Sequence, residues 1–186
     1  MFDWITTGFD FPILDWIQNH LHCGFFDTIM PPVTHLADSG ILWIALAVVL
    51  LCIPKYRQLG LSMGAALLLG LVICNLTMKP LLHRIRPYDY LWEHYGIQVK
   101  LLIEAPHDFS FPSGHTIASF EAATVLMLKD RKWGIPALIL AGIIAFSRLY
   151  LYVHYPTDVL VSILLGVGIG YLATFLVGKG YEKMRS

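Results

Sequence analysis

Two apolar segments meet at a short polar cluster in residues 134–177, which read GIPALILAGIIAFSRLYLYVHYPTDVLVSILLGVGIGYLATFLV. Arg148, His154 and Asp158 lie where the segments meet. On insertion scales an ionisable side chain at membrane depth costs roughly 2.5–3.5 kcal/mol, so such groups are usually retained for a function. The stretch therefore predicts two membrane helices that meet at a functional turn.

The composition indicates a membrane protein. Hydrophobic residues make up 56% of the chain, above the roughly 45–50% typical of soluble domains. No linker or low-complexity tract divides the sequence, so we expect a single domain over residues 1–186. The formal net charge is zero, which gives no indication of a nucleic-acid partner. The three cysteines form no CxxC pair, so we expect neither a disulfide framework nor a zinc site.

Apolar runs near the length of a membrane span predict an all-α integral membrane helical bundle. The five candidate spans are residues 39–53, 60–78, 115–129, 134–153 and 158–177. The first and third are short, and we expect them to lengthen into residues 34–38 and 109–114.

The N-terminal region has a different pattern. In residues 10–30, apolar side chains recur at helical spacing and polar side chains take the other faces, which is typical of an amphipathic helix lying in the membrane interface. The apolar positions are Leu14, Ile17, Leu21 and Phe25, and the polar positions are Asp15, Asn19 and His22. As the alternative, residues 1–33 supply a sixth spanning helix, so we expect five to six transmembrane helices.

The basic residues predict the orientation of the bundle, because cytoplasmic loops are enriched in Lys and Arg. Eight of the thirteen fall on one face: Lys55, Arg57, Lys129, Arg131, Lys132, Lys179, Lys183 and Arg185. The other five fall on the opposite face: Lys79, Arg84, Arg86, Lys100 and Arg148. We therefore expect a plasma-membrane protein with a cytoplasmic C-terminus, and we expect the 79–114 loop to form part of an extracytoplasmic active site.

The first polar motif is KPLLHRIRP, residues 79–87. Lys79 and Arg86 are seven residues apart, so on a continuous helix they would share a face about 10 Å long. Pro87 would end that helix. Arg84 lies in the same motif and would contact substrate or stay solvated. The motif taken alone also fits a basic cluster that touches lipid headgroups.

The second motif is FPSGHT, residues 111–116, which directly precedes an apolar helix. Ser113 is suited to be the N-cap residue, and the free N–H groups at a helix start favour an anion. His115 would lie beside that anion. The alternative is an ordinary capped helix with a histidine at the interface.

The third motif contains the cluster quoted at the start. His154 and Asp158 are four residues apart, so Asp158 can hold one imidazole N–H and leave the other nitrogen free as a nucleophile. Arg148 offers a planar fork that suits phosphate oxygens. Three cations, two histidines and a helix start fit phosphoryl transfer, whose transition state spreads charge over three oxygens.

The three motifs together resemble the signature of the type 2 phosphatidic acid phosphatase superfamily, in order and with unbroken internal spacing. The matching residues are Lys79-x6-Arg86-Pro87, Pro112-Ser113-Gly114-His115 and Ser147-Arg148-x5-His154-x3-Asp158.

This resemblance implies a membrane phosphatase, usually with six spans, that needs no metal or other cofactor. It implies that His154 attacks phosphorus, that Asp158 positions His154, and that His115 protonates the leaving oxygen and then activates water. The phosphate-binding residues that it implies are Lys79, Arg86, Ser113, Gly114 and Arg148.

The substrate that we expect is a lipid phosphate, with undecaprenyl diphosphate favoured. Phosphatidylglycerophosphate or phosphatidic acid is the alternative. A transporter would distribute its charges along a path near the bilayer midplane, whereas these charges gather at one face. A non-catalytic lipid-binding protein is the other rival, but it gives no reason for the intact His154 and Asp158 pair.

Overall fold

The computed structural model describes residues 3–185, and in that range it contains helices and no strand. The helices are α1 (Asp3–Ile5), η1 (Thr6–Asp10), α2 (Phe11–Leu21), α3 (Gly24–His35), η2 (Asp38–Gly40), α4 (Ile41–Cys52), η3 (Pro54–Tyr56), α5 (Arg57–Leu71), η4 (Val72–Met78), α6 (Lys79–Leu82), α7 (Pro87–Tyr95), α8 (Gly114–Lys129), α9 (Arg131–Tyr150) and α10 (Pro156–Arg185). The all-α prediction is confirmed.

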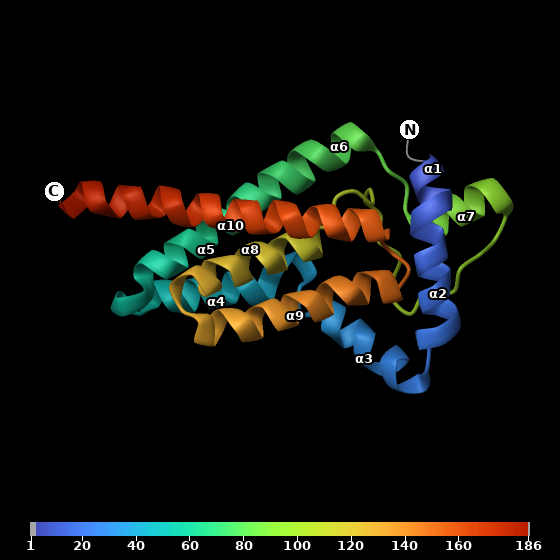
Figure 1. Ribbon diagram of the computed structural model, residues 1–186, viewed down its shortest axis with the longest axis horizontal. Coiled ribbons are helices and arrows are strands. Elements are labelled where there is room, and N and C mark those ends of the chain that lie inside the picture. The colour runs from blue at the N-terminus through green and yellow to red at the C-terminus, as the bar shows by residue number, and fades with distance from the viewer. Residues whose placement is uncertain (1–2, 186) are drawn as a thin grey trace.

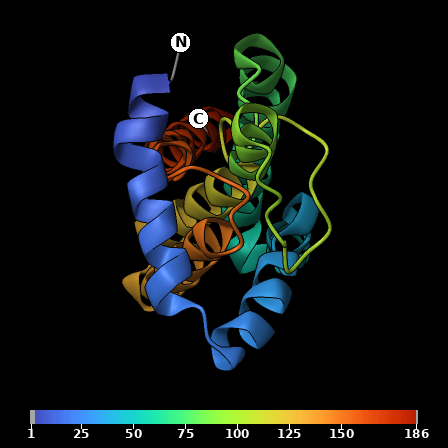
Figure 2. The ribbon, with the colours of Figure 1, turned by 90° about the vertical axis from the view of Figure 1, so that its right-hand side faces the viewer.

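The long helices form a bundle around α8, which packs against α5, α9 and α10, while α4 packs against α5 (Figure 1). The C-terminus, the α4–α5 turn and the α8–α9 turn all lie toward the left of Figure 1. The helix made of α1, η1 and α2 stands across the other end of the bundle (Figures 1 and 2). That end receives the start of α8, the end of α9 and the start of α10, so it gathers the second and third motifs.

Small residues let α10 approach α8 closely. A Cβ atom added at Gly166 would lie 2.8 Å from the carbonyl oxygen of Ile117, and one added at Gly170 would lie 2.7 Å from that of Glu121. Such close backbone approach is typical of membrane helix pairs, in which van der Waals packing supplies most of the association energy. The α8–α10 contact fixes the second motif beside the third.

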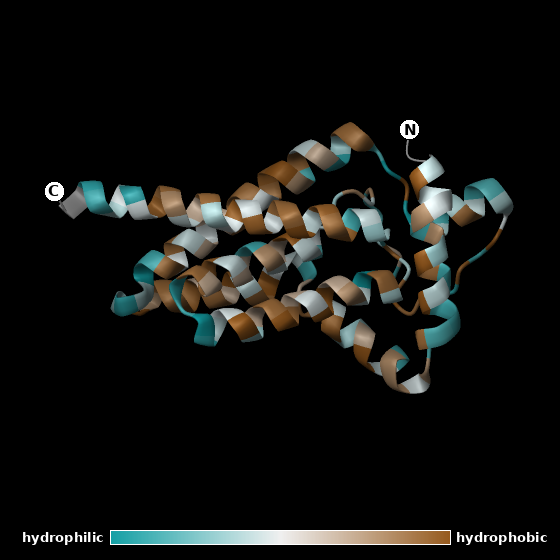
Figure 3. Cartoon of the chain, in the orientation of Figure 1, coloured by the Kyte–Doolittle hydropathy of each residue, from teal (hydrophilic) through white to brown (hydrophobic). Residues whose placement is uncertain are grey.

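Hydrophobic residues predominate along the bundle helices (Figure 3), and many large apolar side chains are exposed, such as Leu164 at 73%. This surface suits contact with lipid tails. Within the described residues, three stretches are long and apolar enough to cross a membrane: Pro54–Tyr95, Arg131–Tyr150 and Pro156–Lys183. Gly24–His35 and Asp38–Cys52 make a fourth if this pair, bent by 44°, counts as one span. The described residues therefore supply three or four candidate spans, and the count of five to six spans stays a prediction.

The two short candidate spans do not lengthen as continuous α-helix, except that Gly114 begins α8. Ser39 has a left-handed backbone (φ 52°), which separates residues 34–38 from α4. Helix α8 starts at Gly114 and has 16 residues, so residues 109–113 do not extend it. Both flanks instead carry side chains of the candidate site.

The amphipathic pattern of residues 10–30 is divided between two helices. His22 and Cys23 have extended backbones and separate α2 from α3. Leu14 and Ile17 are buried, as the pattern predicted, whereas Phe25 lies on the second helix and is 66% exposed. One continuous helix over this range is therefore wrong, because the apolar spacing continues across a break in the backbone.

Replacing Gly166 by alanine should weaken the α8–α10 contact, because the added methyl group meets backbone atoms that cannot move aside. We expect a loss of about 1–3 kcal/mol in unfolding free energy, as is usual for overpacking, measured as a lower thermal midpoint in detergent. Gly168→Ala is the matched control, since a Cβ at Gly168 meets nothing within 4 Å. Equal midpoints for the two variants would contradict this account of the packing.

Candidate active site

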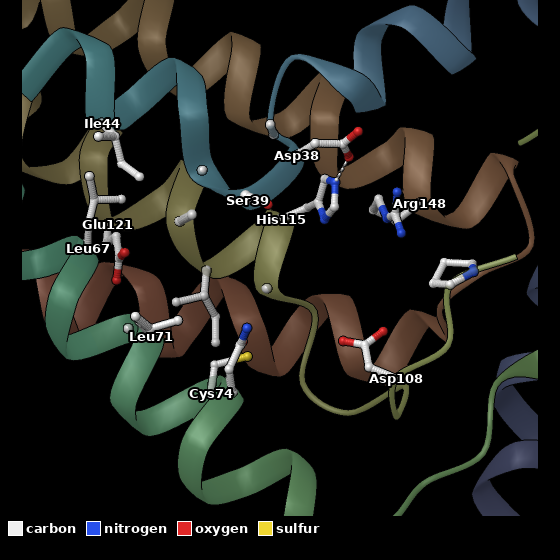
Figure 4. A pocket seen from close by; sticks show the side chains of 18 of the residues that line it. Asp38, Ser39, Ile44, Leu67, Leu71, Cys74, Asp108, His115, Glu121 and Arg148 are labelled. Carbon is white, nitrogen blue, oxygen red and sulfur yellow. Dashed lines mark hydrogen bonds and ion pairs between the residues drawn. The ribbon is translucent and has the colours of Figure 1, made fainter. Parts of the chain in front are cut away.

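A cavity of about 880 Å³ opens at the end of the bundle where the motifs meet. Six of the eight predicted site residues line it: Lys79, Arg86, Gly114, His115, Arg148 and His154. The other two, Ser113 and Asp158, are fully buried beside it. The structure thus brings the three motifs together, and Figure 4 shows His115 and Arg148 on the same side of the cavity.

His154 lies in the short link between α9 and α10 and is 1% exposed. Its Nε2 atom is 3.3 Å from Nη1 of Arg86, which can only donate, so the lone pair of Nε2 faces that donor. The proton then resides on Nδ1, which lies 3.5 Å from Oδ2 of Asp158. Burial, together with the charges of Arg86, Arg148 and Lys79, holds the pKa of His154 well below its usual value. His154 is therefore a neutral imidazole whose Nε2 carries the lone pair.

Asp158 faces His154 as predicted, but at 3.5 Å the contact is longer than a direct hydrogen bond, and Nδ1 has no other partner within residues 3–185. The carboxylate of Asp158 is held by its neighbours. It accepts hydrogen bonds from the side chain of Arg84, the hydroxyl of Ser110 and the backbone N–H of Tyr155. Catalytic hydrogen bonds are often long without substrate and shorten when it binds.

Arg84 is neither solvated nor in the cavity lining, which corrects both readings of the sequence. It is 6% exposed and bonds the carboxylates of Asp158 and Asp10, at 2.5 and 2.6 Å. This pairing was not predictable from local sequence, because Asp10 and Asp158 are each 74 residues from Arg84.

The first motif does not form a continuous helix. Helix α6 ends at Leu82, His83 has a left-handed backbone (φ 47°), and residues 83–86 are not helical. Pro87 begins α7 rather than ending a helix, which is a favourable place for proline because its missing N–H would have no partner there. The break still directs Lys79 and Arg86 to a common point.

That point is the carboxylate of Asp108, in the link between α7 and α8. Its Oδ2 pairs with Nζ of Lys79, and its Oδ1 accepts from Nη2 of Arg86 at 2.5 Å. Partial burial raises the pKa of Asp108, but hydrogen bonds and charge from Lys79 and Arg86 prevail and lower it to about 2. Asp108 is thus an anion bound to two cations that line the cavity, in the way that a phosphate would be.

Arg148 is 3% exposed and donates from Nη1 to the hydroxyl of Thr34 at 2.6 Å. Its Nε atom has no hydrogen-bond partner among the described residues. A buried guanidinium N–H without an acceptor is costly. An anion in the cavity would supply that acceptor.

His115 lies in the first turn of α8, and its Nε2 is 2.8 Å from Oδ1 of Asp38. The other oxygen of Asp38 is 2.6 Å from Nδ1 of His35. Figure 4 shows Asp38 and His115 joined in this way. Neither Asp38 nor His35 was predicted, because both precede α4 and are distant in sequence from His115, Asp38 by 77 residues. The only available signal was polar residues at the edge of an apolar run.

Ser113 occupies the N-cap position of α8, but its side chain makes no capping hydrogen bond. Its hydroxyl accepts from Thr116, and its backbone N–H donates to the hydroxyl of Ser162 on α10. Ser113 therefore occupies the predicted N-cap position but does not form a capping hydrogen bond with its side chain. The first N–H groups of α8 have no intrahelical partners and can bind an anion.

Glu121 also lines the cavity, farther along α8 from His115. It is 1% exposed, and its Oε2 has no hydrogen-bond partner within the described residues. From the sequence, this carboxyl group is expected to pair with a cation of the motifs or to make a polar contact with a neighbouring helix. The space for it comes from Gly70, where an added Cβ would lie 2.3 Å from Oε2.

The cavity thus combines an anion site, an available imidazole nitrogen and a second histidine, which are the groups that phosphoryl transfer requires. Among residues 3–185, no three His, Cys, Asp or Glu side chains are placed to hold a metal ion.

Neutralising Asp108 should free Lys79 and Arg86 for a ligand. We expect Asp108→Asn to bind vanadate, a phosphate analogue, about 10-fold more tightly than the wild type does, equivalent to about 1.4 kcal/mol of binding free energy. The measurement is the inhibition constant of vanadate. Asp89→Asn is the matched control, because Asp89 lies in the first turn of α7 and does not line the cavity. Weaker binding by Asp108→Asn would mean that Asp108 holds the cations in place rather than competing for them.

Comparison with known proteins gives a consistent set of relatives. Residues 55–181 match the family model described as the PAP2 superfamily. The undecaprenyl-diphosphatase of Sulfolobus acidocaldarius is 30% identical over 142 residues, which cover 76% of this chain and 66% of that relative. The crystal structure of Aquifex aeolicus LpxE is similar with a TM-score of 0.75 and 26% identity, over 88% of this chain and 93% of that one. A PAP2-type phosphatidylglycerolphosphate phosphatase from Bacillus subtilis aligns with a TM-score of 0.63 and 25% identity, over 89% and 80%.

Proposed function

The chain belongs to the PAP2 superfamily, and on that premise we propose that it is an integral membrane lipid phosphatase that converts undecaprenyl diphosphate to undecaprenyl phosphate. One observation carries the proposal. A single cavity joins His154 and the cations to an apolar arm between α4 and α5. The arm is lined by Ile44, Val48, Leu51, Leu67, Leu68 and Leu71. A phosphate linked to a long hydrocarbon tail fits both parts.

The first step forms a phosphoenzyme. Nε2 of His154 attacks the terminal phosphorus, a nitrogen–phosphorus bond forms, and the bridging phosphorus–oxygen bond breaks. His115 gives its proton to the departing lipid phosphate. Lys79, Arg86 and Arg148, with the N–H groups at the start of α8, stabilise the charge on the three equatorial oxygens.

The second step releases phosphate. His115, now neutral, takes a proton from water, and the resulting hydroxide attacks the phosphorus of the phosphohistidine. The nitrogen–phosphorus bond breaks and restores His154. Asp38, hydrogen-bonded to His115, balances the positive charge that His115 carries when protonated. No metal ion has a role in either step.

Glu121 supports a second candidate substrate class, phosphatidylglycerophosphate or phosphatidic acid. Its side chain lines the cavity, and its Oε2 atom has no hydrogen-bond partner in the part of the chain that the structure describes. The ester or hydroxyl groups of a glycerolipid can hydrogen-bond to it, whereas a prenyl tail offers no polar group there. The name of the Sulfolobus relative favours the prenyl diphosphate instead.

The proposed orientation places the cavity on the extracytoplasmic side and the C-terminus in the cytoplasm. It follows from the eight basic residues at the opposite end of the helices.

Purified protein should release phosphate from undecaprenyl diphosphate with EDTA present. His154→Ala should lower the rate by more than about 1,000-fold, because covalent catalysis is lost with the nucleophile. The measurement is phosphate release in detergent, with phosphatidylglycerophosphate, phosphatidic acid and a soluble phosphate ester assayed in parallel.

His20→Ala, on the exposed face of α2, is the control and should leave the rate unchanged. Full activity of His154→Ala would refute the assigned nucleophile. Faster turnover of a glycerolipid than of the prenyl diphosphate would favour the second candidate.

A further inference from the structure

The N-terminal helix has two distinct faces. Residues 3–21 run without interruption through α1, η1 and α2 across the end of the bundle (Figure 2). One face exposes large apolar side chains: Trp4, Phe9 and Trp16. The other face is buried: Thr6, Asp10, Phe11, Leu14 and Ile17. A carboxylate on the buried face of such a helix must be paired.

Asp10 is 0% exposed and makes three contacts with residues far along the chain. Its Oδ2 accepts from Nη2 of Arg84 at 2.6 Å and from the hydroxyl of Thr157 at 2.8 Å. Its Oδ1 accepts from the backbone N–H of Thr157 at 2.9 Å. Thr157 precedes Asp158, so Asp10 holds both the backbone next to Asp158 and the cation that bonds Asp158.

Arg84 connects the two carboxylates through separate nitrogens of one planar group. Nη2 bonds Asp10 and the hydroxyl of Thr6, and Nη1 bonds Asp158. Its guanidinium carbon lies 3.9 Å above the ring of Tyr155. The position of Arg84, and through it that of Asp158, therefore depends on Asp10.

The charges of this chain give Asp10 an electrostatic role as well. When Nε2 of His154 bonds to phosphorus while Nδ1 keeps its proton, the ring becomes cationic. Asp158 alone cannot balance that charge, because Arg84 neutralises it. With Asp10 included, the set of two carboxylates and one guanidinium carries a net charge of −1 beside the ring.

We propose that Asp10 is a positioning residue for the nucleophile: it holds Arg84, and so fixes the carboxylate of Asp158 and supplies the negative charge that a phosphorylated His154 requires. This inference rests on the proposed function, in which His154 is the nucleophile. It assigns to the N-terminal helix, outside all three motifs, a part in the chemical step.

Asp10→Asn tests the proposal, because it keeps the shape of the side chain and removes its charge. We expect kcat to fall about 10- to 100-fold, as is common for residues that support a catalytic group through another residue. KM and the inhibition constant of vanadate should stay within about threefold, since Lys79, Arg86 and Arg148 are unchanged. A general loss of folded protein would instead lower the fraction of sites that bind vanadate.

Asp15→Asn is the matched control. Asp15 lies on the same helix and accepts a hydrogen bond from the hydroxyl of Tyr152 at 3.0 Å, in the same α9–α10 link. It has no contact with Arg84 or Asp158. We expect its kcat to remain within about threefold of the wild type, and an equal fall in both variants would overturn the proposal.

A double-mutant cycle tests the route through Asp158. In an Asp158→Asn background, adding Asp10→Asn should lower kcat by less than it does in the wild-type background, because the part of its effect that passes through the carboxylate of Asp158 has been removed. The same fall as in the wild-type background would overturn the proposal.

If Asp10→Asn does not fold, Arg84→Lys tests the same link. A lysine ammonium cannot present two separate nitrogens to the two carboxylates. We expect at least about a 10-fold loss of kcat, and an unchanged kcat would overturn the proposal.

Different experimental results would refute this inference and the proposed function. Wild-type protein without lipid phosphatase activity, or active His154→Ala, would refute both. An active wild type, inactive His154→Ala and unchanged Asp10→Asn would refute only the role of Asp10.

Discussion

Four basic side chains are buried at one end of an apolar helical bundle, and the need to balance their charge determines what surrounds them. Lys79, Arg84, Arg86 and Arg148 would each cost several kcal/mol if left unpaired in such surroundings. Asp10 and Asp158 share Arg84, and Asp108 shares Lys79 and Arg86. Arg148 is the least balanced, with a neutral hydroxyl as its side-chain partner in the described chain and one N–H without an acceptor. An anion in the cavity would give that N–H its acceptor.

The two histidines of the cavity differ in how they are supported. His154 is enclosed, and surrounding cations keep it neutral, so its lone pair is available. His115 sits at the start of α8 with the carboxylate of Asp38 on one nitrogen, but burial and the charges of Arg148 and Lys79 outweigh that carboxylate and lower the pKa of His115 to about 4. A carboxylate lies near each ring, Asp38 beside His115 and Asp158 beside His154. Of the two, only Asp158 also pairs with a buried arginine, Arg84. The pKa of each ring is thus held below its usual value, and the two rings differ in the carboxylate that lies beside them.

The sequence predicted the fold class and the convergence of the motifs well, because both depend on local patterns. Apolar runs specify helices, and motifs at the ends of successive helices meet when those helices pack side by side. The helix break at His83 was not predictable, since KPLLHRIRP contains no glycine and its only internal proline is suited to a helix start. Asp10, Asp38 and Asp108 were also missed. Which acid meets which base is decided by tertiary packing, and nothing in their local sequence marks these aspartates among the others.

The pairing of Asp10 with Thr157 joins residues 147 positions apart. During synthesis the chain emerges from its N-terminus, so Asp10 can meet Arg84 midway, but it can meet Thr157 only when most of the bundle has been made. Arg84 likewise is made 74 residues before Asp158. The contacts that tie the first helix to the last are therefore among the latest that a newly made chain can form.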